Sequence, residues 1–319
     1  MAPVAAHFQD TIPVSLAYPS MEPLRPTPDA VYPPSQPRRA PKERTPPVRT
    51  AFAFDTMETA IAAVARGEFV VVMDDEGREN EGDLIVPAAG CSTEQMAWMI
   101  KHTRYGLTIL LPPLRTHRTF YSLPFSTSVN SGYICISLPG DRLEALSIPM
   151  MVPQNEERHR TAYTVTVDYK HGTVFPPSPP SALYIRIRNL TESASHTGTS
   201  TGISAHDRAL TARALAAPVG MHAQDFTRPG HMVPLRARPG GVLTRRGHTE
   251  AAVDLCALAG LPRAGLLCEL VNDDEIGSMM RRDACRAFAD RFGLPMISVA
   301  MLVGHRERTE GITVPKAQL

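Results

Sequence analysis

The spacing of apolar residues predicts the first helices of this chain. Apolar positions recur at helical intervals after Asp55 and again after Ser92. Each of these two residues is followed three positions later by Glu58 or Gln95, which is the arrangement of a capping box. We therefore predict two helices, the first with Asp55 as its N-cap and with its end at Gly67.

Short apolar runs farther along the chain predict strands, with helices between them. Residues 163–168 alternate between apolar and polar side chains, as in a half-buried strand. The other predicted strands are residues 69–73, 131–138, 229–237, 266–271 and 296–299. The other predicted helices begin at Ser204, with Asp207 as its capping partner, at His248, with an end at Gly260, and at Ser278, with an end at Phe292. A short element is expected to close the chain.

An acidic stretch, DDEGRENEGD at residues 74–83, follows directly on the apolar run 69–73. Its six carboxylates cannot all face a core, because burying unpaired like charges is costly. They must face water, a cation or a cationic substrate. A solvated charged turn is one interpretation, since charge runs usually lie on the surface. Gly77 and Gly82 bracket the centre of the stretch and favour a shaped loop, whose oxygen ligands would suit Mg²⁺.

Further polar clusters stand at the ends of apolar segments. Residues 245–249, RRGHT, lie at a predicted helix start with His231 upstream, and residues 199–204 form a candidate phosphate loop. We interpret His248 as a neutral, metal-binding imidazole because two neighbouring arginines disfavour its protonated form; a satisfied core or surface histidine is the alternative. Glu269 lies in an apolar run. It is either a core glutamate paired with an arginine or a carboxyl with a raised pKa for acid–base work.

Composition limits the classes of function. The chain has 43% hydrophobic residues and a formal net charge of +1, with no apolar run of membrane-spanning length and no secretory signal pattern. We expect neither nucleic-acid nor membrane binding. The five cysteines form no C-x-x-C pair, which predicts reduced thiols and a cytoplasmic protein. Residues 1–48 hold twelve of the thirty prolines, which predicts a disordered tail before a folded domain at residues 49–319.

Four segments are highly specific when taken together: DDEGRENEGDL, TGISAHDRALT, RPGHMVPLRARPGGVLTRRGHTEAAVDLCALAGL and CELVNDDEIGSMMRRD. They resemble the 3,4-dihydroxy-2-butanone 4-phosphate synthase family of riboflavin biosynthesis, over about residues 53–306. The resemblance implies a single-domain α/β (α+β) fold, with a mixed sheet flanked by helices, that works as a homodimer. It also implies conversion of D-ribulose 5-phosphate to formate and L-3,4-dihydroxy-2-butanone 4-phosphate, with Mg²⁺ or Mn²⁺.

Roles for individual residues follow from the same resemblance. Glu79 and His248 would bind the metal ion, and His231 and Glu269 would carry out proton transfer. The substrate-binding residues would be Arg78, Glu79, Asp83, Arg245, Arg246, Gly247, His248, Thr249 and Glu269. Bifunctional relatives carry an additional C-terminal GTP cyclohydrolase II domain. We expect that second activity to be absent, because the chain ends shortly after the match.

Residues 104–130 and 173–198 have no counterpart in the family pattern, and removing them restores it. Each segment is a whole number of codons with ends compatible with intron boundaries, so we hypothesise that both are translated introns. The main prediction is an active synthase. The alternatives are an inactive isoform of the same family, whose insertions block assembly, and, more distantly, a different metal-dependent phosphosugar lyase.

Overall fold

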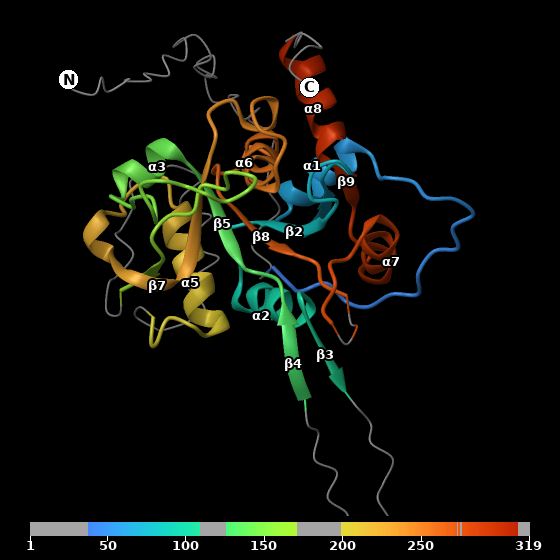
Figure 1. Ribbon diagram of the computed structural model, residues 1–319, viewed down its shortest axis with the longest axis horizontal. Helices are drawn as coiled ribbons and strands as arrows, with labels where there is room; N and C mark the ends of the chain where they lie inside the picture. The colour runs from blue at the N-terminus through green and yellow to red at the C-terminus, as the bar shows by residue number, and fades with distance from the viewer. Residues whose placement is uncertain (1–37, 109–125, 171–198, 273, 275, 312–319) are drawn as a thin grey trace, which may run out of the picture.

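A mixed β-sheet between two layers of helices forms the centre of the protein (Figure 1). The computed structural model describes residues 38–108, 126–170, 199–272, 274 and 276–311. The strand order is β6-β7-β5-β8-β2-β1-β9, with parallel pairs β1–β9 and β5–β7 and antiparallel pairs elsewhere. The bounds are β1 Val70–Met73, β2 Gly82–Pro87, β5 Cys135–Pro139, β6 Val167–Tyr169, β7 Phe226–Ala237, β8 Gly265–Glu269 and β9 Met296–Ser298. The predicted α/β fold with a mixed sheet flanked by helices is confirmed.

Alternation of side chains along the strands divides the core into two halves. Val72, Ile85 and Leu267 belong to the half that packs with α1 (Met57–Ala65), α6 (His248–Leu258) and α8 (Val299–Glu310). The other half packs with α2 (Thr93–His102), α3 (Gly140–Ala145), α5 (Ala205–Ala216) and α7 (Arg282–Phe292). Residues two positions apart on a strand share a face, so Asp83 and Glu269 point to the side of α6. The short helices η2 (Ala223–Asp225) and η3 (Gly241–Leu243) lie in connections.

Capping confirms two of the predicted helix starts and corrects a third. The side chains of Ser92 and Ser204 accept the predicted hydrogen bonds from the third residue of their helices. The first helix is capped by Thr56 rather than Asp55. The carboxylate of Asp55 instead accepts from the backbone N–H of Met296 and from Arg286, both at 2.7–2.8 Å, so it joins β9 and α7 to the helix start.

Several predicted elements have different bounds in the structure. The predicted strand 131–138 is divided, because β4 (Ser126–Ser131) ends where it was expected to begin and β5 starts four residues later. The segment 163–168 contributes only the start of β6, since its first residues make isolated bridges. The helix predicted from Ser278 begins at Arg282, because Met279 forms an antiparallel bridge with Val271 instead of joining the helix. Strand β2 was missed because its first residues lie inside the acidic stretch, and the short closing element is the twelve-residue helix α8.

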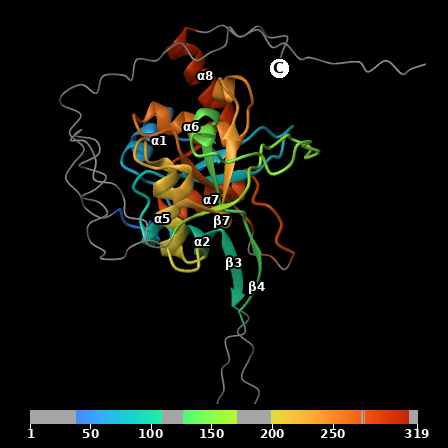
Figure 2. The same cartoon turned by 90° about the vertical axis from the view of Figure 1, so that its left-hand side faces the viewer.

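Both predicted insertions leave and re-enter the domain at neighbouring positions. Strands β3 (Arg104–Thr108) and β4 form an antiparallel ribbon that projects from the body of the domain in both views (Figures 1 and 2). At its base, the N–H of Gly132 donates to the carbonyl of Thr103 at 3.0 Å. At the second insertion, the hydroxyl of Thr199 donates to the carbonyl of Tyr169. The parts between, residues 109–125 and 171–198, lie outside the described residues.

The domain includes a segment that the sequence assigned to the tail. Residues 1–37 lie outside the described residues, but residues 38–48 run along the surface of the domain. Arg38 donates to the carbonyl of Ala89 at 2.6 Å, and the N–H of Arg44 donates to the carbonyl of Arg291 at 2.7 Å. Within the described part of the chain, no helix is long and apolar enough to cross a bilayer.

Candidate metal-binding active site

The acidic loop, residues 74–83, is folded around the buried carboxylate of Asp74. One oxygen of Asp74 accepts from the N–H of Glu81 at 2.8 Å. The other accepts from the N–H of Glu79 at 3.0 Å and from the guanidinium of Arg78 at 2.8 Å. Asn80 has a left-handed backbone, with φ of 55°, at the tip of the loop. The loop is therefore shaped by its own hydrogen bonds, and the interpretation as a merely solvated turn does not hold.

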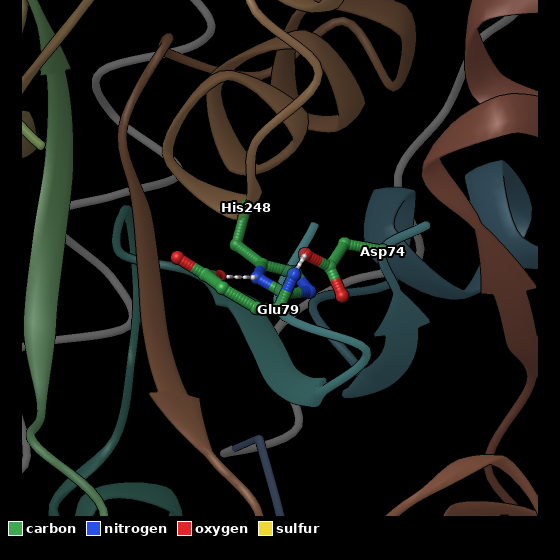
Figure 3. Close-up of side chains that lie close together, drawn as sticks. All are labelled: Asp74, Glu79 and His248. Atoms are coloured by element: carbon green, nitrogen blue, oxygen red, sulfur yellow. Dashed lines mark hydrogen bonds and ion pairs between the residues drawn. The ribbon is translucent and has the colours of Figure 1, made fainter. Parts of the chain in front are cut away.

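His248, the first residue of α6, places its imidazole against this loop (Figure 3). Its Nε2 lies 3.1 Å from the carbonyl oxygen of Val72, and a carbonyl only accepts, so Nε2 carries the hydrogen. The other ring nitrogen, Nδ1, lies 3.6 Å from Oε2 of Glu79 and 3.5 Å from Oδ1 of Asp83. This nitrogen therefore points at two carboxylates.

These groups have the chemistry of a site for a hard divalent cation. Ligand atoms of Asp74, Glu79 and His248 all lie within 4.8 Å of one another. Among the described residues, the buried Oδ1 of Asp83 has no hydrogen-bond partner. Carboxylate oxygens with one imidazole suit Mg²⁺ or Mn²⁺. Because Asp74 is occupied in shaping the loop, Glu79 and His248 are the residues free to act as ligands.

Burial and neighbouring charges shift the pKa values of this pocket. Burial opposes the ionisation of Glu79, but its hydrogen bond to His248 and the charge of Arg78 prevail and lower its pKa to about 2. Burial likewise opposes protonation of His248, but Asp83 and the other carboxylates prevail and raise its pKa to about 9. Burial raises the pKa of Asp83 to about 8. The pocket thus stabilises positive charge, which a divalent cation would supply in place of the proton.

The predicted reason for a neutral His248 is wrong. The neighbouring Arg245 faces away from it and donates to the carboxylate of Glu250 at 2.6 Å. The same guanidinium donates to the hydroxyl of Thr161 at 3.0 Å and to the carbonyl of His159 at 3.2 Å. The carboxylates around His248 therefore dominate its electrostatics, and Arg245 supports a neighbouring loop.

That loop brings a histidine which the sequence reading missed. Nε2 of His159 lies 3.9 Å from Oε1 of Glu79. The loop is braced by Glu157, whose carboxylate accepts from the N–H groups of His159 and Thr161 at 2.8 and 2.6 Å. Its sequence has no strand or helix period, so no pattern could place His159 at the site.

The start of α6 offers donors for an anion. Its N-cap is Gly247, which has no side chain to cap the first turn, so N–H groups of the first turn are open to an anionic ligand. Arg246 is partly exposed beside it, and the described residues include no hydrogen bond or ion pair to its guanidinium. Thr249, in the same turn, is buried. The helix start and Arg246 together suit a phosphate.

In the candidate phosphate loop at residues 199–204, several donors bind a carboxylate of the protein itself. The carboxylate of Asp207 accepts from the N–H groups of Ser200 and Gly202, each at 3.0 Å, and from the hydroxyl of Ser200 at 2.8 Å. These donors of Ser200 and Gly202 are occupied within the protein, so they are not available to a phosphate; binding by the rest of the loop stays a prediction. Gly202 packs instead against Asp168 and His231, where a Cβ atom would collide with both side chains.

Glu269 is the last residue of β8 and lies opposite Asp83 on β2. Its Oε2 accepts from the backbone N–H of Tyr133 at 2.7 Å. Within the described residues it has no arginine partner, so the interpretation as a core glutamate in an ion pair is not supported. Glu269 and Asp83 share the face of the sheet that His248 covers.

His231 forms a separate pair with Asp168. Its Nδ1 lies 2.6 Å from Oδ2 of Asp168, and its backbone N–H donates to Oδ1 at 2.8 Å. This pairing fixes the ring with Nδ1 as the donor, which leaves Nε2 free to exchange a proton. The side chain of His231 is 43% exposed. Among the described residues it makes no hydrogen bond or ion pair with Glu79, His248 or Glu269.

An α/β fold that gathers carboxylates and an imidazole beside an uncapped helix start has the features of a metal-dependent enzyme with an anionic substrate. A family model described as 3,4-dihydroxy-2-butanone 4-phosphate synthase matches residues 58–130, 116–175 and 186–305. The chain belongs to the 3,4-dihydroxy-2-butanone 4-phosphate synthase family. The predicted family, and with it the prediction of an enzyme of riboflavin biosynthesis, is confirmed.

Individual relatives support the same assignment. The 3,4-dihydroxy-2-butanone 4-phosphate synthase of Schizosaccharomyces pombe is 44% identical over 247 residues, which cover 77% of this chain and 95% of that protein. Riboflavin biosynthesis protein RibBA of Rhodococcus erythropolis is 42% identical over 257 residues, and the chain spans about half of its length (48%).

Solved structures agree with these sequence relatives. A structure of 3,4-dihydroxy-2-butanone 4-phosphate synthase in complex with two magnesium ions has a TM-score of 0.62 and 40% identity, covering 81% of this chain and 99% of that one. The Candida albicans enzyme has a TM-score of 0.56 and 40% identity, covering 79% and 97%. The chain therefore resembles both enzymes in sequence as well as in fold.

Proposed function

We propose that this protein converts D-ribulose 5-phosphate into formate and L-3,4-dihydroxy-2-butanone 4-phosphate, with Mg²⁺ or Mn²⁺ bound by Glu79 and His248. The observation that carries the proposal is the convergence of Nδ1 of His248 and the carboxylate of Glu79 at 3.6 Å beside an uncapped helix start. Magnesium binding by a relative that is 40% identical supports the choice of cation. When bound, the cation would supply positive charge to oxygens of the substrate.

The other residues of the pocket would hold the substrate. Arg246 and the N–H groups of His248 and Thr249 would bind the phosphate at the positive end of α6. Gly247, whose own N–H donates to the carbonyl of Arg245 at 2.9 Å, would let the substrate approach the backbone closely. Oδ1 of Asp83 is buried and accepts no hydrogen bond from the described residues, so it would accept one from a substrate hydroxyl. Arg78 would keep the carboxylate of Glu79 in place, since it donates to its Oε2 at 2.5 Å. Arg245 would contribute indirectly, through the loop that carries His159.

Proton transfer is assigned to His231 and Glu269. Removing a proton next to a ketone needs a base, and the later steps need a group that returns a proton. His231 is oriented by Asp168 with its Nε2 free, and Glu269 is held by the N–H of Tyr133 on the face of the sheet below His248. Two bases on different strands would serve different carbons of a small substrate.

A homodimer and a cytoplasmic location are further parts of this proposal. Two apolar side chains are exposed next to residues that contact proposed catalytic groups: Tyr133, whose N–H binds Glu269, is 51% exposed, and Ile203, which follows Gly202, is 53% exposed. A second copy of the chain would cover them. The five cysteines are all free and buried, as expected in a reducing compartment. Light scattering on a sizing column tests the dimer, since a monomer mass at micromolar concentration would contradict it.

We also propose that residues 49–319 form one catalytic domain interrupted by two dispensable segments, 104–130 and 173–198. Residues that flank each segment are hydrogen-bonded to each other, Gly132 to Thr103 and Thr199 to Tyr169. Both interruptions of the family match, the repeated residues 116–130 and the unmatched residues 176–185, fall within these segments. Residues 38–48 would serve as a surface extension of that domain.

Incubation of the purified protein with D-ribulose 5-phosphate and Mg²⁺, followed by a formate assay, tests the function. Formate should appear only with the divalent cation and should stop when a chelator is added. The matched negative controls are Glu79→Gln and His248→Ala. A folded, metal-loaded protein that releases no formate, with or without the two segments, would contradict the proposal.

A further inference from the structure

Arg281 lies beside the metal pocket and has no part in the roles assigned above. It belongs to the connection between Glu269 and α7, and its Nη1 donates to two successive carbonyls, of Glu79 at 2.7 Å and of Asn80 at 2.6 Å. We propose that Arg281 is a positioning residue, which holds the acidic loop in the conformation that directs Glu79 at His248. This inference rests on the proposed metal role of Glu79.

The hydrogen bonds of the acidic loop explain why an outside donor matters. The carbonyl of Asp75 accepts from the N–H groups of Arg78 and Asn80, and the carbonyl of Glu81 accepts from the N–H of Asp74. The carbonyls of Glu79 and Asn80 turn the other way, toward Arg281. A nitrogen that binds both fixes the two peptide planes on either side of Asn80, whose φ is positive. Those planes set the direction in which the side chain of Glu79 leaves the backbone.

Backbone hydrogen bonds hold Arg281 and the residue before it in place. It occupies the N-cap position of α7, and its carbonyl accepts from the N–H of Cys285 at 2.9 Å. The residue before it donates to the carbonyl of Leu270 at 2.8 Å, and Leu270 donates to the carbonyl of Gly82 at 2.9 Å. These hydrogen bonds therefore connect the end of β8, which carries Glu269, to Gly82 at the end of the acidic loop. Through Arg281, α7 fixes the middle of that loop as well.

Charge contributes less than geometry to this contact. Nη1 of Arg281 lies 3.9 Å from Oε1 of Glu81, and the arginine side chain is 53% exposed, so solvent screens the attraction. The neighbouring Arg282 is similarly exposed, at 48%, but it pairs with Asp283 and lies over the ring of Phe52. Among the described residues, Arg282 makes no hydrogen bond or ion pair with the acidic loop, and the charge of Glu76 is the smallest of the causes that raise the pKa of Arg282. It is therefore a matched control with the same charge, the next position and nearly the same exposure.

Binding of Mn²⁺ alone to the metal-free protein tests the inference without relying on turnover. Electron paramagnetic resonance would follow free Mn²⁺ for the wild type, Arg281→Ala, Arg281→Lys, Arg282→Ala and Glu79→Gln. Residues that support metal ligands typically change affinity by 10- to 100-fold, and the exposure of Arg281 favours the lower end, so we expect a Kd about tenfold higher for Arg281→Ala. Hydrogen exchange of the amides in residues 74–83 should accelerate in the same variant.

The remaining variants separate the possible outcomes. Arg281→Lys should lie between the wild type and Arg281→Ala, since an ammonium group can still donate to carbonyls, and Arg282→Ala should match the wild type. Equal Mn²⁺ affinity and loop exchange in Arg281→Ala and Arg282→Ala, with binding lost in Glu79→Gln, would overturn the role of Arg281 alone. Unchanged binding in Glu79→Gln would overturn the metal assignment and this inference with it. If Arg281→Ala fails to fold, Arg281→Gln, which keeps an amide donor, replaces it. Its Mn²⁺ affinity and loop exchange are then compared with those of Arg282→Ala.

Discussion

His248 is tied to Val72 by a hydrogen bond of 3.1 Å from its Nε2 to the carbonyl oxygen of β1. This bond fixes the tautomer and the ring plane, so that Nδ1 faces the carboxylates. Histidine ligands commonly require such a second partner. Strand β1 also leads directly into the loop that carries Glu79. One strand thus orients both proposed metal ligands, although they are separated by almost 170 positions in the chain.

Replacing Glu79 by Gln should abolish metal-dependent turnover while the fold remains intact. Gln has the size of Glu but not its charge, and a hard cation binds carboxylate oxygens far better than amide oxygens. His248→Ala should behave in the same way. Formate release titrated with Mg²⁺ measures the effect, with circular dichroism as the control for folding. Near-normal formate production at limiting Mg²⁺ in either variant would show that it is not a ligand.

Replacing Glu269 by Gln should leave a folded protein that binds substrate without turning it over. The contact that Glu269 makes is with the N–H of Tyr133, and the amide oxygen of Gln can accept the same hydrogen bond. The loss of a proton-transfer group predicts a fall in kcat of about 10²- to 10⁴-fold. Calorimetric binding of ribulose 5-phosphate and the melting temperature should stay close to those of the wild type. An unfolded variant would instead indicate a structural role.

Replacing Asp168 by Asn should lower kcat through His231. An Asn side chain no longer stabilises a positive imidazole and can favour the wrong tautomer, and losses of about 10²-fold or more are typical of such pairs. A double variant tests this explanation. Adding Asp168→Asn to His231→Ala should lower kcat little further, because the histidine on which Asp168 acts is already absent. Additive losses from the two substitutions would show that Asp168 acts on something other than His231.

His102 should make the protein less stable as the pH falls through mildly acidic values. Burial, with help from Lys101 and Arg291, lowers its pKa from 6.5 to about 4. Between these values the unfolded chain binds a proton that the folded protein resists, so the free energy of unfolding declines as pH drops from about 6.5 toward about 4. Its ring lies 4.5 Å from that of Trp98, an environment suited to a neutral ring.

The matched variant for this test is His102→Phe, which keeps an aromatic ring but has no titratable group. Urea unfolding at about pH 7 and about pH 5 should show a larger loss of stability in the wild type, by at most about 1 kcal/mol after allowance for solvent screening. Parallel losses in the two proteins would assign the pH dependence to other groups.

Deleting residues 104–130 and 173–198 together should give a more stable and more active protein. Hydrogen bonds already hold the chain together close to both junctions, from Gly132 to Thr103 and from Thr199 to Tyr169, and the deletions remove a closure cost of about 1–3 kcal/mol. The melting temperature and the rate of formate release should both exceed those of the full chain. Deletion of residues 1–37 is the control for a general effect of shortening.

The outcomes of this deletion distinguish the status of the two segments. Equal activity in both forms would make them tolerated surface segments, and lower activity would make them part of the working enzyme. Sequencing the transcript tests the intron hypothesis separately. A dominant mature message that encodes residues 110–125 would contradict it.

The sequence by itself determined the elements whose signals are local. The capping residues Ser92 and Ser204 and the helix start at His248 depend on neighbours within four positions, and each lies where the sequence places it. The family was also readable, because its motifs are contiguous. Glu79, Asp83 and Arg78 could be proposed as site residues for the same reason, because they lie in the contiguous acidic motif that carries the resemblance.

Only the tertiary structure determined which partner each of these side chains binds. The sequence predicts Asp55 as a helix cap, but its carboxylate binds Met296 and Arg286, which are more than two hundred positions away. Asp207 accepts the hydrogen bonds of Ser200 and Gly202 in the 199–204 loop, and Arg245 pairs with Glu250, so these donors have partners within the protein. Side chains such as His159 and Arg281 reach the site through folded connections that have no period in sequence. Contacts between distant segments depend on the packing of the whole sheet, and a linear pattern carries no record of that packing.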